Sequence, residues 1–476
     1  MRQSFVAFDS IAVNTHCRLD QKYLSFVSTD NWTVFKNNNL VQVPLSHYLT
    51  VASIKKLKKG TLDQEYTLIN ISDQLQKTGD ITNTKQVREI GSDKNILSGY
   101  DFFISKLGMP RGYIFSNSLN DRNDVIGSTE LIPYRLTFPQ SKIFLKYLLL
   151  HPQMLEVYRR LESGKTPSHR RVNPSEFLKI KVPLLSDFDL VTEKIAPLSA
   201  EILKLEEKIE SQEAILNRIF AKTYDYDEEL HNELGKGMTA GTQASRVRAL
   251  KIMYTNLCDF ANTKSLRNST RSNNPVTRKL TLELKRKETI KIGDITLEPI
   301  RRGKSPKYDP SGPIPVVKTG HLKNGSVVIS NEEFVTEEFY SSSNKAHIKR
   351  GDILIASTGK VSLGKVSFYE GDERLIADSH VSIVRLRADD FNGKFIAYFL
   401  RSLLGYFQIE RDFTGSTNQI ELSPDAIREI LVPNEDISSQ NRIVELIDTH
   451  LHRQNAIVQE IKERRQSIDK IISLFL

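Results

Sequence analysis

The sequence has few cysteines and no long hydrophobic run, and each absence excludes a class of protein. Cys17 and Cys258 are its two cysteines, so no disulfide framework of the secreted type is indicated. The N-terminal residues are acidic and polar where a secretory signal needs a basic start and an apolar stretch. The most apolar run, residues 144–155, contains Lys146 and His151 and is far shorter than the ~20 residues of a membrane-spanning helix. We therefore expect no export, no membrane insertion and a reducing, cytoplasmic location.

Motifs of self-sufficient enzymes are also missing. The sequence has neither the Asn/Asp-Pro-Pro-aromatic tetrad nor the glycine-rich cofactor loop of amino-methyltransferases, and it lacks His-Glu-x-x-His and Cys-x-x-Cys. His450 and His452 are two residues apart, on different faces of a helix. Asp101 and Asp352 begin strand-like runs, where turn and capping roles are typical. We therefore expect no catalytic residue, no metal and no cofactor in this chain.

Positive charge is what the sequence has in excess. Lys and Arg total 67 against 58 Asp and Glu, a net charge of +9 with a pI near 9.2. Between residues 246 and 304 there are 15 Lys and Arg against 5 Asp and Glu. A solvated basic face is the simpler interpretation, but the excess favours a polyanionic partner, nucleic acid first.

The chain repeats itself after about 250 residues. The segment YDFFI at 100–104, followed by a glycine, recurs as GDILI at 351–355. The series SGKTP, NP and KVP that starts at 163 recurs as TGSTN, SP and LVP from 414. Two ordered matches at nearly one displacement indicate a duplicated unit.

One phosphate-binding pattern does not survive this comparison. Residues 359–365 read GKVSLGK, but Val366 stands where a phosphate-binding loop needs a hydroxyl residue for magnesium. The matching segment 108–113, GMPRGY, lacks the lysine too. The β-prone residues 366–369 predict a strand where that motif needs a helix. We expect no nucleotide site here.

Each copy ends in an apolar stripe with coiled-coil spacing. The first stripe is Ile195, Leu198, Ile202, Leu205, Ile209, Leu216 and Ile219, with Gln212 in its one gap; the second is Ile443, Ile447, Ile457, Ile461, Ile468, Ile471 and Phe475. Ser186 is a plausible N-terminal cap, and Pro197 is expected to start or kink the first helix. An amphipathic helix on a globular core is the alternative, but two matching stripes favour two helices that pair.

Connectivity then predicts the layout. The second copy starts where the first helix ends, so the second helix has to run back along the first. We predict an antiparallel pair with one globular domain at each end. Helices over 197–220 and 443–475 would be about 36 and 48 Å long. A turn of DNA measures about 34–36 Å, so the helices could act as a ruler between two DNA-binding domains.

The predicted fold class is α+β: two tandem mixed α/β domains, separated by two long antiparallel coiled-coil helices, in a pseudo-two-fold repeat. The predicted parts are domain 1 at 1–185, a central spacer helix at 186–223, a linker at 224–266 with a helix near 244–262, domain 2 at 267–435 and a C-terminal spacer helix at 436–476. Strands are expected at 66–70, 112–115, 314–318, 352–356, 364–368 and 381–385, and helices at 141–161 and 391–407.

Several loops have the chemistry of DNA contacts. Residues 301–308, RRGKSPKY, alternate basic residues, an aromatic residue and turn residues. They can therefore hold phosphates or address guanine edges. Residues 414–419 include two amides that can pair with adenine, whereas the matching loop 164–171 is basic; an ordinary polar turn is the alternative. The candidate DNA contacts are Arg301, Arg302, Lys304, Ser305, Lys307, Tyr308, Lys318, Lys360, Thr417, Asn418 and Gln419 in the second copy, and Lys58, Lys59, Lys106, Arg111, Lys165, Ser168, His169, Arg170 and Arg171 in the first.

Taken together, these motifs resemble the specificity subunit of type I restriction-modification systems. The resemblance is carried by RRGKSPKY at 301–308 with GPIP at 312–315, GDILI at 351–355 with Thr358-Gly359 and Gly364, TGST at 414–417, the exit LVP at 431–433, and Gln440 with Ile443. It spans nearly the whole chain, although the first copy lacks the RRGKSP run and the Thr-Gly pair.

The resemblance implies two target-recognition domains that each bind one half of a bipartite DNA site. It further implies helices that dock two modification subunits, with S-adenosylmethionine, ATP and magnesium used by the modification and restriction subunits. Two alternatives remain from other classes. One is a self-sufficient restriction or modification enzyme. The other is a coiled-coil scaffold that binds DNA without sequence preference.

Overall fold

The computed structural model describes residues 23, 26, 32–36, 40–51, 53–71, 74, 77–119, 122–164, 169–185, 187–226, 275–323, 325–329, 333–359, 362–387, 389–415 and 420–476. Most of the predicted linker, including the helix near 244–262, lies outside these residues. Within them, no helix is both long enough and apolar enough to cross a membrane.

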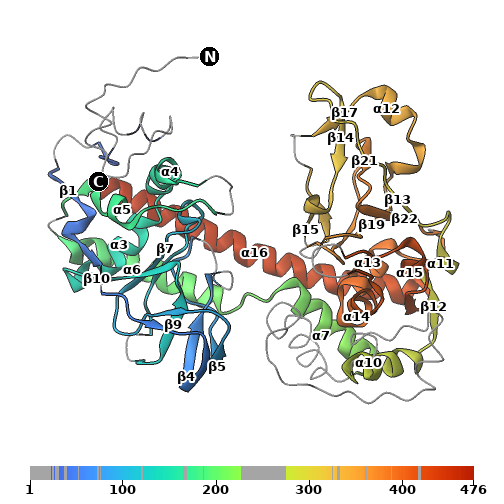
Figure 1. The fold of residues 1–476 in the computed structure, drawn as a ribbon, viewed down its shortest axis with the longest axis horizontal. Helices are drawn as coiled ribbons and strands as arrows, with labels where there is room; N and C mark the ends of the chain where they lie inside the picture. The colour runs from blue at the N-terminus through green and yellow to red at the C-terminus, as the bar shows by residue number, and fades with distance from the viewer. Residues whose placement is uncertain are drawn as a thin grey trace. The chain divides into compact units, whose positions relative to one another are not determined.

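The chain folds into two compact units, each of mixed helix and strand (Figure 1). The first unit comprises Met1–Ile209 together with Ala456–Leu476, and the second comprises Glu210–Asn455. This confirms the predicted α+β class. Because the C-terminal residues belong to the first unit, the chain ends in the unit in which it begins.

The first unit is built on an antiparallel sheet of order β2-β10-β7-β8. Its strands are Leu49–Val51, Leu131–Leu136, Phe102–Ser105 and Ile114–Ser116, and the helices α3 (Lys142–Leu149), α4 (Pro152–Leu161) and α5 (Pro174–Lys179) follow in the chain. A second sheet, of order β3-β6-β9-β4-β5, comprises Lys56–Leu57, Lys94–Ile96, Val125–Ser128, Gly60–Ile69 and Lys85–Ile90. β1 (Gln42–Pro44) pairs with β11 (Lys181–Pro183). Phe102, Tyr134 and Phe144 are buried in the core between the first sheet and the helices.

The second unit repeats this plan. Its central sheet has the order β13-β22-β19-β20, with strands Arg301–Arg302, Val381–Val384, Ile353–Ala356 and Val366–Phe368. Its other large sheet, β17-β14-β21-β18, comprises Phe334–Val335, Ile314–Val317, Leu375–Ala377 and His347–Ile348. β12 (Thr289–Lys291) pairs with β23 (Leu431–Pro433), and β15 (Leu322–Lys323) pairs with β16 (Ser326–Val327). The helices are α10 (Pro275–Lys285), α11 (Ile292–Ile295), α12 (Glu337–Ser341), α13 (Gly393–Arg401), α14 (Leu403–Asp412) and α15 (Pro424–Arg428).

The duplication inferred from sequence is confirmed by strand order. β7 begins at Phe102 and β19 at Ile353, 251 residues later, and each is the third strand of its sheet. β11 and β23, at the exits of the two copies, lie 250 residues apart. In equivalent sheets, β4 pairs in parallel with β9 and β14 pairs in parallel with β21. The two units therefore share one scaffold.

The predicted strands are confirmed, but two predicted helices are each broken into two. The helix expected at 141–161 is interrupted at His151, whose ring nitrogen caps α4 ahead of Pro152. The helix expected at 391–407 is interrupted at Ser402, between α13 and α14. Pro152 has no N–H for a continuing helix, which explains the first break. The strand at Val366–Phe368 confirms that the GKVSLGK segment is not followed by a helix.

The prediction of one continuous central helix over residues 186–223 is also wrong, because the structure has two helices there. α6 covers Phe188–Glu206 and continues through Pro197, and α7 covers Gln212–Tyr224. Asp187 caps α6, while Ser186 lies outside the described residues. Ser211 starts α7, because its side-chain oxygen accepts a hydrogen bond from the N–H of Ala214. The apolar spacing of the stripe persists across this break, so the spacing concealed it.

The C-terminal helix α16 covers Ile437–Phe475, close to the predicted 436–476. In the first unit it lies antiparallel to α6: Arg464 pairs with Glu201 at 2.6 Å, and Lys194 lies 5.4 Å from the ring centre of Phe475. The apolar side chains that meet there also belong to the core of the first unit. In addition, Tyr147 of α3 donates a 2.7 Å hydrogen bond to Ser199 of α6. Both interpretations of the stripe therefore hold in part.

The stripe residues differ in burial. Ile195, Ile202, Leu216, Ile219, Ile443, Ile447 and Ile468 are buried, whereas Leu198, Leu205, Ile209, Ile457, Ile461 and Ile471 are half-buried. Ile472, which was not predicted, is fully buried next to Ile471. In the second unit, α7 packs on α13 through Phe220, whose ring centre lies 5.7 Å from that of Phe399.

Candidate nucleic-acid interface

In the second unit, four segments that are separate in sequence meet beside the central sheet. Backbone bridges join Thr358 to Glu421 and Thr414 to Glu421. The N–H of Ser357 donates to the carbonyl of His380 at 2.9 Å, and the N–H of Leu422 donates to Ser357 at 2.8 Å. The strand β13, which carries Arg302, joins the same sheet. We call the side chains of Arg302, Ser305, Thr358, Ser379, His380 and Glu421 the second loop cluster.

Arg302 ties β13 to this cluster. Its Nη2 donates to the carbonyl of Leu422 at 2.9 Å and lies 2.8 Å from a carboxylate oxygen of Glu421. The hydroxyl of Thr358 lies 2.8 Å from Nδ1 of His380, and Ser305 donates to Ser379 at 3.2 Å. Hydroxyl, imidazole, guanidinium and carboxylate groups are thus presented side by side. Such groups address base edges and phosphates.

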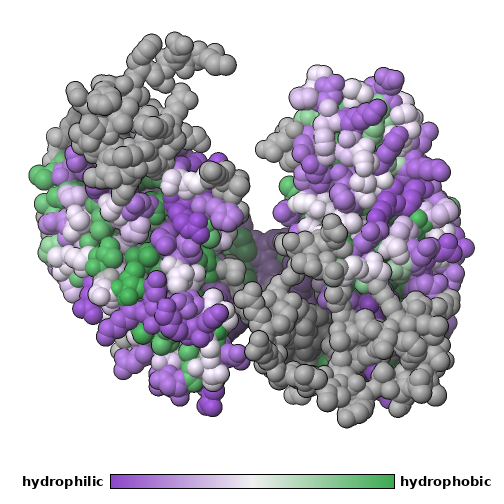
Figure 2. All heavy atoms as spheres, in the orientation of Figure 1, coloured by the Kyte–Doolittle hydropathy of each residue, from purple (hydrophilic) through white to green (hydrophobic). Residues whose placement is uncertain are grey.

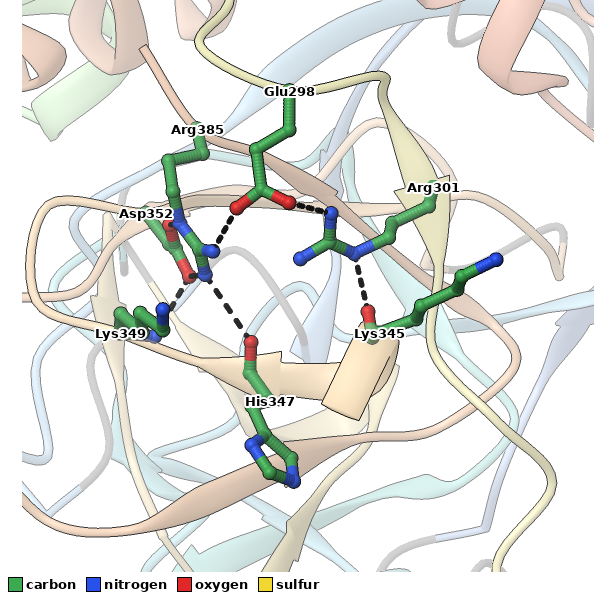
Figure 3. A network of polar contacts seen from close by, with 7 residues as sticks. All are labelled: Glu298, Arg301, Lys345, His347, Lys349, Asp352 and Arg385. Carbon is green, nitrogen blue, oxygen red and sulfur yellow. Dashed lines mark hydrogen bonds and ion pairs between the residues drawn. The ribbon is translucent and has the colours of Figure 1, made fainter. Parts of the chain in front are cut away.

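Arg301, the neighbour of Arg302, is held in a different network (Figure 3). Its guanidinium pairs with Glu298, which also pairs with Arg385, and its Nε donates to the carbonyl of Lys345. The two arginines hold the pKa of Glu298 at about 2, chiefly through hydrogen bonds from Arg301. These contacts fix the turn before β13, so Arg301 has a structural role; a contact to DNA stays a prediction for it.

The predicted loop 301–308 is wrong in its first two residues, which form β13, and residues 303–308 run from that strand toward β14. Gly303 passes close to β21, because a Cβ there would lie 2.0 Å from the carbonyl oxygen of Ala377. Lys304 donates to Ser343 at 3.1 Å, and Lys307 is exposed. Nζ of Lys318 lies 4.7 Å from the ring centre of the exposed Tyr308 and 2.5 Å from a carboxylate oxygen of Glu333. The surface over β14, β17 and α12 is mostly hydrophilic in this view (Figure 2).

The first unit has an equivalent cluster with different chemistry. Backbone bridges join Leu107 to Arg171 and Ser163 to Arg171. Arg171 forms two hydrogen bonds with the carboxylate of Glu130, at 2.9 and 3.0 Å, and Lys106 lies 3.8 Å from the same carboxylate. Arg171 lowers the pKa of Glu130 most strongly, through those hydrogen bonds. We call Lys106, Glu130 and Arg171 the first loop cluster.

The remaining candidates of the first unit are exposed at other points. Lys58 and Lys59 lie between β3 and β4, where Lys58 pairs with Asp93 at 3.2 Å. Arg111 is in the turn Met109–Arg111, and His169 and Arg170 precede Arg171. Six candidates lie outside the described residues: Lys165, Ser168, Lys360, Thr417, Asn418 and Gln419.

Sequence reasoning missed five members of the two clusters. Glu130, Thr358, Ser379, His380 and Glu421 were not candidates, because acidic and neutral residues carry no signal in a search for basic patches. The repeat did offer a signal for some of them, because Glu130 and His380 lie 250 residues apart, as do Arg171 and Glu421. In the described part of the chain, no group of three or more His, Cys, Asp or Glu side chains is arranged to hold a metal ion.

Comparison with known proteins places the second unit in a family. Residues 285–464 match the type I restriction modification DNA specificity domain. No curated protein matches the chain. Among solved structures, the S subunit of a type I restriction-modification system from M. genitalium is 16% identical over 93% of this chain and 97% of that one, with a TM-score of 0.39. The HsdS subunit from Thermoanaerobacter tengcongensis is 12% identical over 91% and 96%, with a TM-score of 0.30.

A third solved chain comes from work on complex assembly and conformational transition of the type I R-M system. It is 13% identical over 92% of this chain and 97% of that one, with a TM-score of 0.36. TM-scores of this size do not establish a shared arrangement, so the family of residues 285–464 rests on the family match.

Residues 285–464, which make up most of the second unit and run into α16, therefore form a type I restriction modification DNA specificity domain. The resemblance found in the sequence is thereby confirmed for these residues.

Proposed function

We propose that the chain binds a bipartite DNA site, with each unit reading one half through its loop cluster. The observation that carries this proposal is the duplicated scaffold: the two clusters occupy equivalent bridges in equivalent sheets, but they present different side chains. Two copies of one scaffold with different contact groups suit two half-sites of different sequence.

Phosphate contacts would come from the exposed Lys and Arg side chains around the two clusters. In the second unit, Lys304 and Lys307 follow β13 directly. In the first unit, Arg170 precedes Arg171. Because phosphate contacts carry no sequence information, these residues would position the duplex, while the clusters discriminate between bases.

The partner subunits belong to the same proposal. The chain would dock two modification subunits along its long helices, and restriction subunits would join that complex. α16 exposes Leu446 and Val458, which a protein surface could cover. Methyl transfer, translocation and cleavage, with their S-adenosylmethionine, ATP and magnesium, would then belong to the partners and not to this chain.

Selection from random duplexes tests the DNA proposal. The full chain should enrich a split motif that persists as salt rises, because nonspecific phosphate binding weakens steeply with salt whereas base readout remains. His380→Ala should weaken one half of the motif only, and Lys279→Ala on α10 serves as a surface control. Binding without enrichment would favour the nonspecific scaffold, and methyl transfer by the purified chain alone would favour an enzyme.

Co-purification tests the docking proposal. Leu446→Asp and Val458→Asp should reduce recovery of the modification subunit from co-expressing cells at least fivefold, because each places a charge in an apolar contact. Lys462→Ala, on an exposed part of the same helix, should leave recovery unchanged. Equal recovery in all variants would place the docking surface away from these residues.

A further inference from the structure

Arg171 and Glu421 occupy the same place in the two units. Arg171 exchanges backbone hydrogen bonds with Ser163 at 2.8 and 2.9 Å, and Glu421 exchanges them with Thr414 at 2.7 and 2.9 Å. The next residue of each unit donates to the loop after the third sheet strand, Val172 to Lys106 and Leu422 to Ser357. The same pattern of backbone hydrogen bonds therefore holds both residues, although their side chains carry opposite charges.

Each of the two residues pairs with a partner of opposite charge that is less exposed. In the first unit, the Arg171 side chain is 40% exposed and its partner Glu130 is 21% exposed. In the second unit, the Glu421 side chain is 51% exposed and its partner Arg302 is 24% exposed. The more accessible charge at these equivalent positions is thus positive in the first unit and negative in the second. The less exposed partner holds the orientation of each side chain.

The pairing leaves hydrogen-bonding capacity on both residues. Arg171 uses Nε and Nη2 for Glu130 and Nη1 for the carbonyl of His169, so of its five N–H groups one remains on each terminal nitrogen among the described contacts. Glu421 meets Arg302 with Oε1, and no side chain of the described residues pairs with its Oε2. One residue therefore offers paired donors, and the other offers an acceptor.

We propose that Arg171 and Glu421 are the equivalent specificity-determining residues of the two units. Arg171 would recognise the N7 and O6 acceptors of a guanine, and Glu421 the amino group of a cytosine. Glu130 and Arg302 are positioning residues that hold them. The proposal rests on the proposed function, and it adds which residue in each unit discriminates and which base it prefers.

The test is selection from random duplexes with the full chain and with two conservative variants. Arg171→Lys keeps the charge but loses the planar fork, so the preference for one G·C pair in one half of the motif should fall about tenfold or more. Glu421→Gln keeps the shape but adds a donor, so one C·G pair in the other half should shift toward A·T. The half read by the unaltered unit should be unchanged in each variant.

The outcomes separate this inference from the function that it rests on. If the wild-type chain enriches a split motif and both variants enrich the same motif, the two residues are not specificity determinants, although the proposed function stands. If the wild-type chain enriches nothing, the proposed function itself fails. Unfolding midpoints of the variants check the fold, and Arg171→Gln and Glu421→Asp replace any variant that does not fold.

Discussion

Asp352 and Arg385 form a bidentate ion pair, with both carboxylate oxygens accepting 2.7 Å hydrogen bonds from Nε and Nη2 of the arginine. The Asp352 side chain is fully buried, and its Oδ2 also accepts from the N–H of Lys349. The first unit keeps both residue types at the equivalent positions but joins them differently. There Asp101 accepts from the N–H of Leu136 at 2.9 Å, and Arg135 lies over the ring of Tyr100.

Asp352→Asn should destabilise the second unit by about 2–3 kcal/mol, because it breaks a buried bidentate pair and leaves Arg385 with Glu298 as its carboxylate partner. Asp101→Asn, the matched change in the first unit, should cost about 1 kcal/mol, because it weakens a hydrogen bond and leaves no buried cation behind. Denaturant unfolding of the full chain followed by circular dichroism measures both. Equal losses would show that the buried ion pair adds nothing beyond a hydrogen bond.

Glu206 predicts a pH dependence of stability. Its side chain is buried in α6, and burial, aided by the nearby carboxylate of Asp80, raises its pKa from 4.5 to about 7. The folded chain therefore holds this proton to higher pH than the unfolded chain does. The free energy of unfolding should fall as pH rises from about 4.5 to 7, by on the order of 3 kcal/mol.

Glu206→Gln should remove most of that fall, because the amide does not ionise. Urea unfolding at pH 5 and pH 8 measures it, and Glu207→Gln on the exposed face is the control. A wild-type chain whose free energy of unfolding does not decrease between these pH values would contradict the prediction.

The pairing of α16 with the first unit predicts a sharp contrast along one helix. Ile468→Ala should cost about 2–4 kcal/mol, because Ile468 is fully buried in the core of that unit. Leu474→Ala should cost less than about 0.5 kcal/mol, because that side chain is 83% exposed. Thermal unfolding distinguishes the two changes. A similar loss in both would mean that the helix is stabilised by its own propensity and not by packing.

Salt dependence should reveal a phosphate contact. If Lys307 binds a phosphate, Lys307→Ala should lower the slope of log affinity against log salt by about 1 without changing the selected motif. Lys279→Ala on α10, which Figure 1 shows at the opposite end of the second unit from α12, should leave the slope unchanged. Fluorescence anisotropy at several salt concentrations measures both slopes.

The repeat could be predicted because its signal consists of short sequence motifs that recur in the same order. Strands around Ile353 and Phe102 are short apolar runs with a glycine a few residues after each, and such runs keep their signal in each copy. The breaks at His151, Ser402 and Ser211 were missed. Apolar periodicity survives a change of helix when the two helices share a buried face, so it does not report the interruption. The available signals were Pro152, the first residue of α4, and Ser211, the N-terminal cap of α7.

The candidate site was predicted only in its basic half. Arg302 and Arg171 stand out by charge, whereas Glu421 and Glu130 become meaningful once the bridges bring them next to those arginines. Which arginine pairs with which carboxylate depends on contacts between segments 41 and 119 residues apart. Such contacts are set by tertiary structure, and no local pattern encodes them. The same reason explains why Arg301 resembled its neighbour Arg302 in sequence but joins another network.

The first unit completes its core with side chains synthesised last. Ile468 and Ile472 are fully buried there, beside residues such as Ile195 that leave the ribosome more than 250 residues earlier. During translation this unit therefore waits, with an apolar face uncovered, until the whole second unit has been made. A product of premature termination would keep that face open to chaperones and proteases. A stop codon before residue 468 would thus leave the core of the first unit without Ile468 and Ile472.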